Sequence, residues 1–119
     1  MITFILKRFR SLKFAIRGMY LLIKTEHAII TQSIAGVILI CTGFYFDISR
    51  TEWMIQLVII GNVLAIEGLN TAVEKLCDFV HDDYNKQIGF IKDIATGAIS
   101  FIAIFSLIIL ALIYVPYLM

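Results

Sequence analysis

Two long runs of this chain contain no charged residue, and they constrain its fold more than any other feature. One run covers residues 28–46 and the other covers residues 94–119. An α-helix needs about 20 apolar residues to cross roughly 30 Å of hydrocarbon. With 61% hydrophobic residues and a mean hydropathy of +0.93, the composition is typical of a membrane protein and excludes an ordinary soluble domain.

A third apolar stretch lies between these two runs. The polar segment DISRTE at residues 47–52 is followed by Trp53, an aromatic residue that favours the membrane interface. No charge follows until Glu67, and the helical character continues to about Val80. We therefore predict a single all-α membrane domain over residues 1–119, with the last span ending near Pro116. The predicted membrane helices cover residues 28–46, 53–80 and 94–114.

Residues 1–25 combine apolar and basic side chains in a helical pattern. Six of the ten Lys and Arg residues lie before residue 25, largely off the face formed by Ile5, Phe9, Leu12, Ile16, Met19 and Ile23. This spacing of three and four predicts an amphipathic helix on the membrane surface, with its cations near anionic head groups. The alternative is a basic flank that only sets the topology.

The distribution of cations also predicts the topology of the chain. Lys and Arg are abundant before the first span and occur again at Lys86 and Lys92, whereas the 47–52 link has a single Arg. Because cytoplasmic loops carry an excess of Lys and Arg, we expect the amino terminus and the 81–93 loop to face the cytoplasm. Three spans then place the two termini on opposite sides. Such a small bundle buries few polar groups by itself, so oligomerisation is plausible.

The second span contains a polar stripe within the segment AIEGLNTAVEKLCD at residues 65–78. At about 100° per residue, Glu67, Asn70, Glu74 and Asp78 fall on one side of the helix. Glu67 lies roughly 21 Å of helix beyond Trp53, inside the membrane but near its cytoplasmic boundary. An acidic residue at that depth is a hypothesis of function, because an unpaired charge there is costly. The alternative is a buried Glu that holds helices together by hydrogen bonds.

Two further positions are candidates for binding a phosphate or a metal. Lys92 and Asp93 directly precede the third predicted span, where the free N–H groups of a helix terminus and a lysine suit an anion. Their alternative reading is a topology-setting lysine and a capping aspartate. Glu26 stands where the surface helix turns into the first span and can reach the level of Glu74. Two such carboxylates can hold Mg²⁺ together with substrate phosphates, although Glu26 can also be a plain interfacial end residue.

The chain resembles the small prokaryotic lipid kinase family, which contains diacylglycerol kinase and undecaprenol kinase. The resemblance rests on E-x-x-N-T-A-x-E-x-x-x-D at residues 67–78, on the following K-D pair, and on TEHA and TEWMI before or at the start of the first two spans. It covers almost the whole chain. Such kinases use no GxxxxGK[ST] loop, and this sequence contains none.

The resemblance implies a homotrimer in the bacterial inner membrane, with active sites between subunits at the cytoplasmic interface. It implies that Glu67 is the general base on the lipid hydroxyl, with Asn70 as a second catalytic residue, and that Glu26 and Glu74 hold the Mg²⁺ of ATP. Asn85 and Ala15 depart from residues that relatives often have, a histidine and a hydroxyl side chain. The nucleotide contacts expected from the resemblance are Lys7, Asp78, Asp83, Tyr84, Lys92 and Asp93.

The TEWMI and LNTAVEKL segments favour undecaprenol over diacylglycerol as the membrane lipid alcohol. No nucleic-acid partner is expected. A rival hypothesis is a small proton-coupled transporter that uses Glu67, although such exporters generally have four spans with the acidic residue in the first. A second rival, a non-catalytic assembly subunit, leaves Glu26 and the Lys92–Asp93 pair without a role.

Overall fold

A computed structural model describes residues 1–80 and 85–119, which form four α-helices and no strand. Three of these helices are long and apolar enough to cross a membrane. The predicted class, an all-α membrane protein, is therefore confirmed. Asp83 and Tyr84 lie outside the described residues. The helices are α1 (Ile2–Thr25), α2 (His27–Phe46), α3 (Arg50–Val80) and α4 (Lys86–Leu118).

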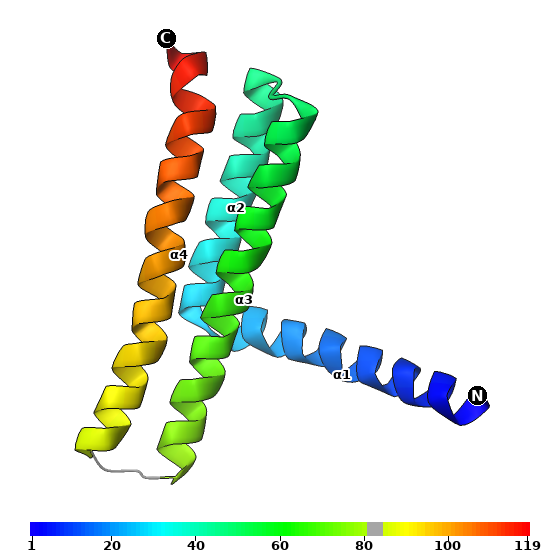
Figure 1. Ribbon diagram of the computed structural model, residues 1–119. Coiled ribbons are helices and arrows are strands. Elements are labelled where there is room, and N and C mark those ends of the chain that lie inside the picture. Colours follow the sequence, from blue (N-terminus) through cyan, green and yellow to red (C-terminus); the bar gives the residue numbers. More distant parts are fainter. Residues whose placement is uncertain (81–84) are drawn as a thin grey trace.

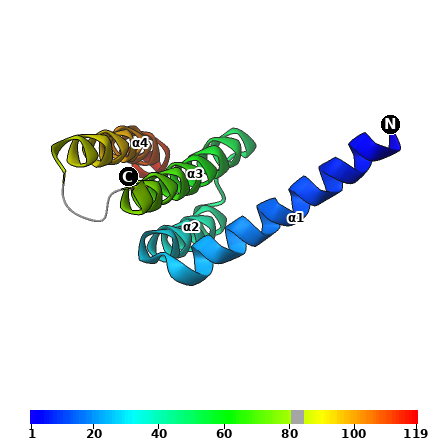
Figure 2. The same cartoon turned by 90° about the horizontal axis from the view of Figure 1, so that it is seen from below.

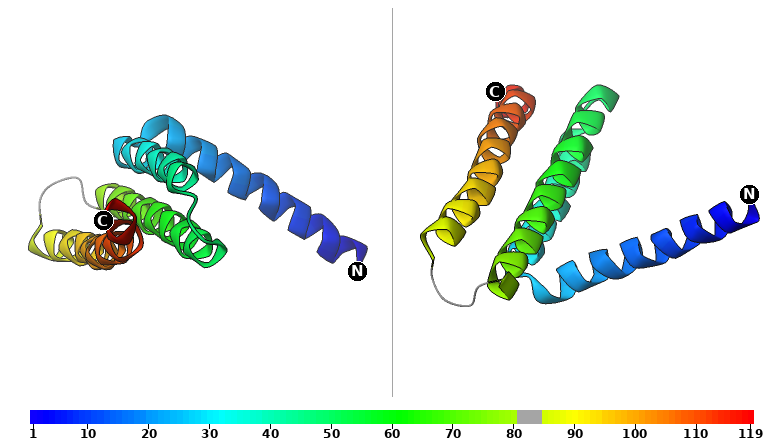
Figure 3. Two further views of the ribbon diagram at one scale, coloured as in Figure 1. Left: turned by 90° about the horizontal axis from the view of Figure 1, so that it is seen from above. Right: turned by 60° about the horizontal axis from the view of Figure 1, so that its bottom comes forward.

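The three apolar helices run side by side, and α3 contacts both α2 and α4 (Figure 1). Helix α1 leaves this bundle at a steep angle, at the end where α3 leads into α4. Figure 2 and Figure 3 show that α1 extends past α2, while α4 lies on the far side of α3. The start of α4 and the junction of α1 with α2 therefore lie at one end of the bundle, and the carboxyl terminus lies at the other.

A single residue separates the surface helix from the first span. Glu26 has extended backbone angles (φ −107°, ψ 117°) and is both the last cap of α1 and the first cap of α2. Its N–H donates to the Leu22 carbonyl at 3.0 Å, and its own carbonyl accepts from the Ile30 N–H at 3.0 Å. Both backbone groups of Glu26 therefore stay bonded although the chain turns sharply at this residue. The turn places the Glu26 side chain at the elbow.

The opposite end of the bundle is closed by a capping box. Asp47 ends α2 in the left-handed conformation. The Ser49 N–H donates to Glu52 Oε1 at 2.9 Å, and the Glu52 N–H donates to Ser49 Oγ at 3.2 Å. This reciprocal pair satisfies two free N–H groups and starts α3 at Arg50, slightly before the predicted Trp53. The Tyr117 hydroxyl of α4 donates to the same Glu52 oxygen at 2.5 Å.

The bounds of α4 differ from the predicted ones. The helix begins at Lys86, because Asn85 caps it by accepting the Gln87 N–H at 2.8 Å. The prediction that Lys92 and Asp93 stand at a helix amino terminus is therefore wrong, since both lie in the second turn of α4. Nor does Pro116 end the helix, which continues to Leu118.

One buried polar group joins all three membrane helices. Gln56 of α3 is 0% exposed, and its Nε2 donates to the Leu39 carbonyl of α2 at 3.1 Å. The Tyr114 hydroxyl of α4 donates to Gln56 Oε1, and the Leu39 carbonyl lies 3.3 Å away as a second acceptor. The hydrophobic effect does not drive helices together in lipid, so hydrogen bonds of this kind and close packing set which residues face each other.

Two glycines let α2 approach α3 closely. A Cβ added at Gly36 would lie 3.1 Å from Ile60 Cγ2, and one added at Gly43 would lie 2.8 Å from the Trp53 ring. By contrast, a Cβ added at Gly61 or Gly97 meets nothing within 4 Å. The helix contact thus depends on the absent side chains at Gly36 and Gly43.

We predict that Gly43→Ala destabilises the bundle by about 1–3 kcal/mol, because the rigid Trp53 ring must move to accept the methyl group. Gly61→Ala and Gly97→Ala are matched controls that should be neutral, or stabilising by about 0.5–1 kcal/mol, since Ala favours helix. Equilibrium unfolding in mixed detergent micelles measures all three. A Gly43→Ala protein as stable as the controls would contradict the packing described above.

Candidate active site

The polar stripe on α3 passes from the interior of the bundle to its surface. Glu67 is buried, with 7% of its surface exposed, whereas Asn70 is half-buried and Glu74 and Asp78 are exposed. Of the acidic residues that the structure describes, Glu67 alone is buried. Three polar side chains therefore follow the buried carboxyl group of Glu67 on the same helix face, and the last two are exposed to solvent.

Asn70 links two levels of the stripe. Its Nδ2 donates to Glu74 Oε1 at 3.2 Å, as expected for residues one turn apart on one face. Its Oδ1 is buried and has no hydrogen-bond partner in the described part of the chain. A buried acceptor without a partner is costly, so this oxygen is available to a ligand or to a neighbouring copy.

An ion pair joins the stripe to α4. Lys92 Nζ lies 2.8 Å from Asp78 Oδ1, and both side chains are partly exposed to solvent. The two residues were predicted from separate sequence signals, and the structure brings them into contact. Asp93, the neighbour of Lys92, is exposed and forms no hydrogen bond or ion pair with the residues described in the structure.

A second ion pair joins α3 to the elbow at Glu26. Lys75 Nζ lies 3.3 Å from Glu26 Oε1, with side-chain exposures of 70% and 24%. Glu26 thus reaches the level of Glu74, but its described contact is with Lys75 and not with Glu74 itself. Lys75 could not be singled out from the sequence, because nothing local distinguishes it from a solvated lysine at the membrane boundary.

Lys7 is not brought to this cluster. It is exposed in the first half of α1, a segment that points away from the bundle in Figure 1. One chain therefore gathers Glu26, Lys75 and the polar stripe with Lys92, and leaves Lys7 apart. Of the two positions that depart from the family pattern, Asn85 serves as the cap of α4 and Ala15 is exposed on α1.

The arrangement fits chemistry on a group that stays at a membrane surface, since a buried carboxyl group lies next to solvent-exposed charges of both signs. The chain matches the family model described as prokaryotic diacylglycerol kinase over residues 13–114. It is similar to the undecaprenol kinase of Bacillus subtilis (strain 168), with 34% identity over 108 residues that cover 91% of this chain and 88% of that protein.

The chain therefore belongs to the prokaryotic diacylglycerol kinase family. It is a multi-pass membrane enzyme of the lipid kinase class, a transferase that acts on an alcohol group. The resemblance noted in the sequence is confirmed, and family membership does not favour the transporter or the assembly subunit.

Glu26 and Glu74 fit the requirements of a Mg²⁺ ion. Both are carboxylates, the hard oxygen ligands that Mg²⁺ prefers; Glu74 is exposed, and the partly exposed Glu26 contacts Lys75, the residue next to Glu74 in the chain. No three His, Cys, Asp or Glu side chains gather into a metal cluster within residues 1–80 and 85–119. A site with two protein ligands suits Mg²⁺, which usually keeps several waters and binds through one or two carboxylates and the phosphates of a substrate.

We predict that exchanging the charges of the Asp78–Lys92 pair keeps the fold but not the activity. An exposed ion pair contributes little stability, so Asp78→Lys, Lys92→Asp and the double exchange should retain helical content by circular dichroism. Lipid kinase activity should fall in all three proteins. Asp78→Lys removes the acidic partner, Lys92→Asp removes the lysine, and the double exchange moves the lysine from α4 to α3. Recovery of wild-type activity in the double exchange would show that the pair is only structural.

Proposed function

We propose that this chain is a kinase that transfers the γ-phosphate of ATP, with Mg²⁺, to the hydroxyl of undecaprenol. The reaction takes place at the cytoplasmic face of the bacterial inner membrane. The observation that carries this proposal is Glu67, an acidic residue buried in an apolar span and followed by polar side chains that lead to solvent. The printed name of the Bacillus subtilis relative supports undecaprenol over diacylglycerol, which remains the alternative substrate.

The two substrates occupy different phases, and the polar stripe spans the boundary between them. A lipid hydroxyl stays at the membrane, whereas a triphosphate stays in water. Glu67 and Glu74 are two turns apart, roughly 10 Å along α3. The base therefore belongs on the lipid side and the metal ligands on the water side, so that the hydroxyl meets the γ-phosphate between them.

Residues of the stripe and of the neighbouring helices have separate roles in this transfer. Glu67 accepts the proton of the lipid hydroxyl as its oxygen forms a bond to the γ-phosphorus, and the bond from that phosphorus to the β,γ-bridging oxygen breaks. The products are lipid phosphate and ADP. Asn70 orients the neighbouring groups, and Lys92 lies close to the phosphates, where its charge offsets theirs. Bound Mg²⁺ would neutralise phosphate charge at Glu26 and Glu74.

We further propose that the working enzyme is a homotrimer. Lys7 is a predicted nucleotide contact, but its own chain holds it away from the stripe (Figure 1). In an assembly of identical copies, the α1 helix of one chain can approach the stripe of another. The unpartnered Asn70 Oδ1 also fits a site that a neighbouring copy completes.

An activity assay on the purified protein tests the function directly. We expect ATP labelled at its γ-phosphate to give labelled lipid with undecaprenol, and less or none with diacylglycerol. Activity should be lost on chelation with EDTA and return with added Mg²⁺. No labelled lipid from either alcohol would refute the proposed reaction, and a clear preference for diacylglycerol would refute the proposed substrate.

We predict that Glu67→Gln lowers turnover by about 100-fold or more, because the amide cannot accept the proton. Glu52→Gln is a matched control on the same helix, roughly 22 Å away. The control should keep its turnover, and both proteins should keep the oligomeric state of the wild type in size-exclusion chromatography. Wild-type turnover in Glu67→Gln would remove its assignment as the base.

A further inference from the structure

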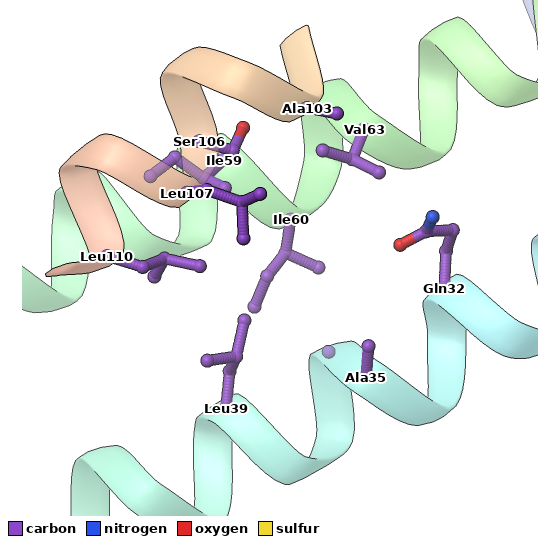
Figure 4. A pocket seen from close by; sticks show the side chains of 11 residues that line it. Gln32, Ala35, Leu39, Ile59, Ile60, Val63, Ala103, Ser106, Leu107 and Leu110 are labelled. Atoms are coloured by element: carbon purple, nitrogen blue, oxygen red, sulfur yellow. The ribbon is translucent and has the colours of Figure 1, made fainter. Parts of the chain in front are cut away.

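A groove of about 310 Å³ lies between α2, α3 and α4, on the side of Glu67 away from the start of α4. Figure 4 shows its lining, in which Ile60 and Val63 of α3, Ala103 and Ser106 of α4, and Gln32 of α2 surround an otherwise apolar space. None of these residues has a part in the reaction described above. The groove is therefore open to a separate assignment.

The groove and the stripe occupy the same helix faces. On α3, Ile60, Val63 and Glu67 follow one another at intervals of three and four, which places them on one face. On α4, Lys92 precedes Ala103 by three turns and points within about 20° of the same direction. The groove thus continues the line of the polar stripe along the same faces of both helices, although Glu67 is not itself among its lining residues.

A second cavity, of about 380 Å³, does not have this continuity. It lies between α1, α2 and α3, where its α3 lining consists of Gly61, Leu64 and Ala65. These residues point about 60° to 160° away from Glu67 around the helix axis. A molecule held at Glu67 therefore continues into the first groove and not into the second.

The helix register gives the depth of the groove relative to Glu67. Gln56 of α3 pairs with Tyr114 of α4, and the two helices run antiparallel. Leu64 is eight residues after Gln56 and Ser106 is eight residues before Tyr114, so Leu64 and Ser106 lie opposite each other. Gly36 of α2 faces Ile60 of α3. Gln32 is one turn before Gly36 and Leu64 is one turn after Ile60, so these two residues also lie at the same level. Gln32 and Ser106 thus stand at one level, roughly 4.5 Å along the helix axis from Glu67.

Ser106 indicates that the groove receives a ligand. It is 6% exposed, and its hydroxyl has no hydrogen-bond partner among the described residues. An unpaired hydroxyl in an apolar setting is costly. An occupant that is largely hydrocarbon but carries an electron-rich group near its reactive end would reduce that cost, since such a group accepts a weak hydrogen bond. The first double bond of a polyprenol lies next to its hydroxyl and has these properties.

We propose that the groove binds the hydrocarbon chain of the lipid alcohol, with its first isoprene unit between Gln32 and Ser106. This assignment rests on the proposed function, because it takes the lipid hydroxyl to be at Glu67. A polyprenol has a single chain that can enter the groove next to its hydroxyl, whereas a diacylglycerol carries two chains that diverge there.

A substitution at an exposed residue of the groove narrows it without changing the buried core. Ala103 is exposed at the groove, so Ala103→Leu adds bulk inside it, whereas Ala98→Leu adds the same bulk about 140° away on α4. We expect Ala103→Leu to lower kcat/KM for undecaprenol at least about tenfold, a typical effect of misplaced methylenes in a hydrophobic pocket. Ala98→Leu should match wild type. Wild-type kinetics of Ala103→Leu on undecaprenol would overturn the assignment.

Photolabelling gives a readout that needs no turnover. A polyprenol with a diazirine near its hydroxyl, irradiated with the full-length protein in lipid vesicles, should label residues 59–63 and 103–110. Labelling should decrease in Ala103→Leu but not in Ala98→Leu. Labelling confined to other faces would overturn the groove assignment even if undecaprenol is phosphorylated. Labelling of the groove in a protein that phosphorylates no lipid would refute the proposed function and leave the groove assignment supported.

Discussion

The hydrogen-bonded group of Gln56, Tyr114 and Leu39 sets the register of the three membrane helices, and the other contacts follow from that register. Gln56 is fully buried, so its amide must find partners inside the bundle, and it finds one on each neighbouring helix. Once these levels are aligned, Asp78 of α3 meets Lys92 of α4 at the opposite end. Ser106 and Gln32 lie at one common level, about one turn of α3 from Glu67.

The site is built on helices rather than on loops. The stripe on α3 and Lys92 on α4 are parts of continuous helices whose backbone hydrogen bonds are satisfied internally, as the lipid environment requires, and Glu26 lies at the one-residue junction of two others. This explains how a lipid kinase can work without a phosphate-binding loop. Helix spacing alone separates the buried Glu67 carboxyl group from the exposed charges of Glu74 and Asp78.

Much of this arrangement could be predicted from single segments. The polar stripe follows from helical periodicity, and the junction at Glu26 follows from the change from a basic amphipathic pattern to a charge-free run. The start of α4 could not be read in this way, because it depends on the side chain of Asn85 capping Gln87 and not on hydropathy. As a result, the predicted position of Lys92 at a helix terminus is wrong, although Lys92 does form an ion pair with Asp78 of the stripe.

By itself the sequence determined an all-α membrane protein with three spans, a surface helix and a line of polar residues entering the second span. Helical periodicity and the cost of a charge in lipid both depend on residues within one segment, so the sequence of that segment is enough to predict their effect. Only the tertiary structure decided that Lys75 pairs with Glu26, that Asp78 pairs with Lys92, and that a groove opens between α2, α3 and α4. These contacts depend on which residues of separate helices face each other. Close packing at glycines and buried hydrogen bonds between segments far apart in the chain determine that register.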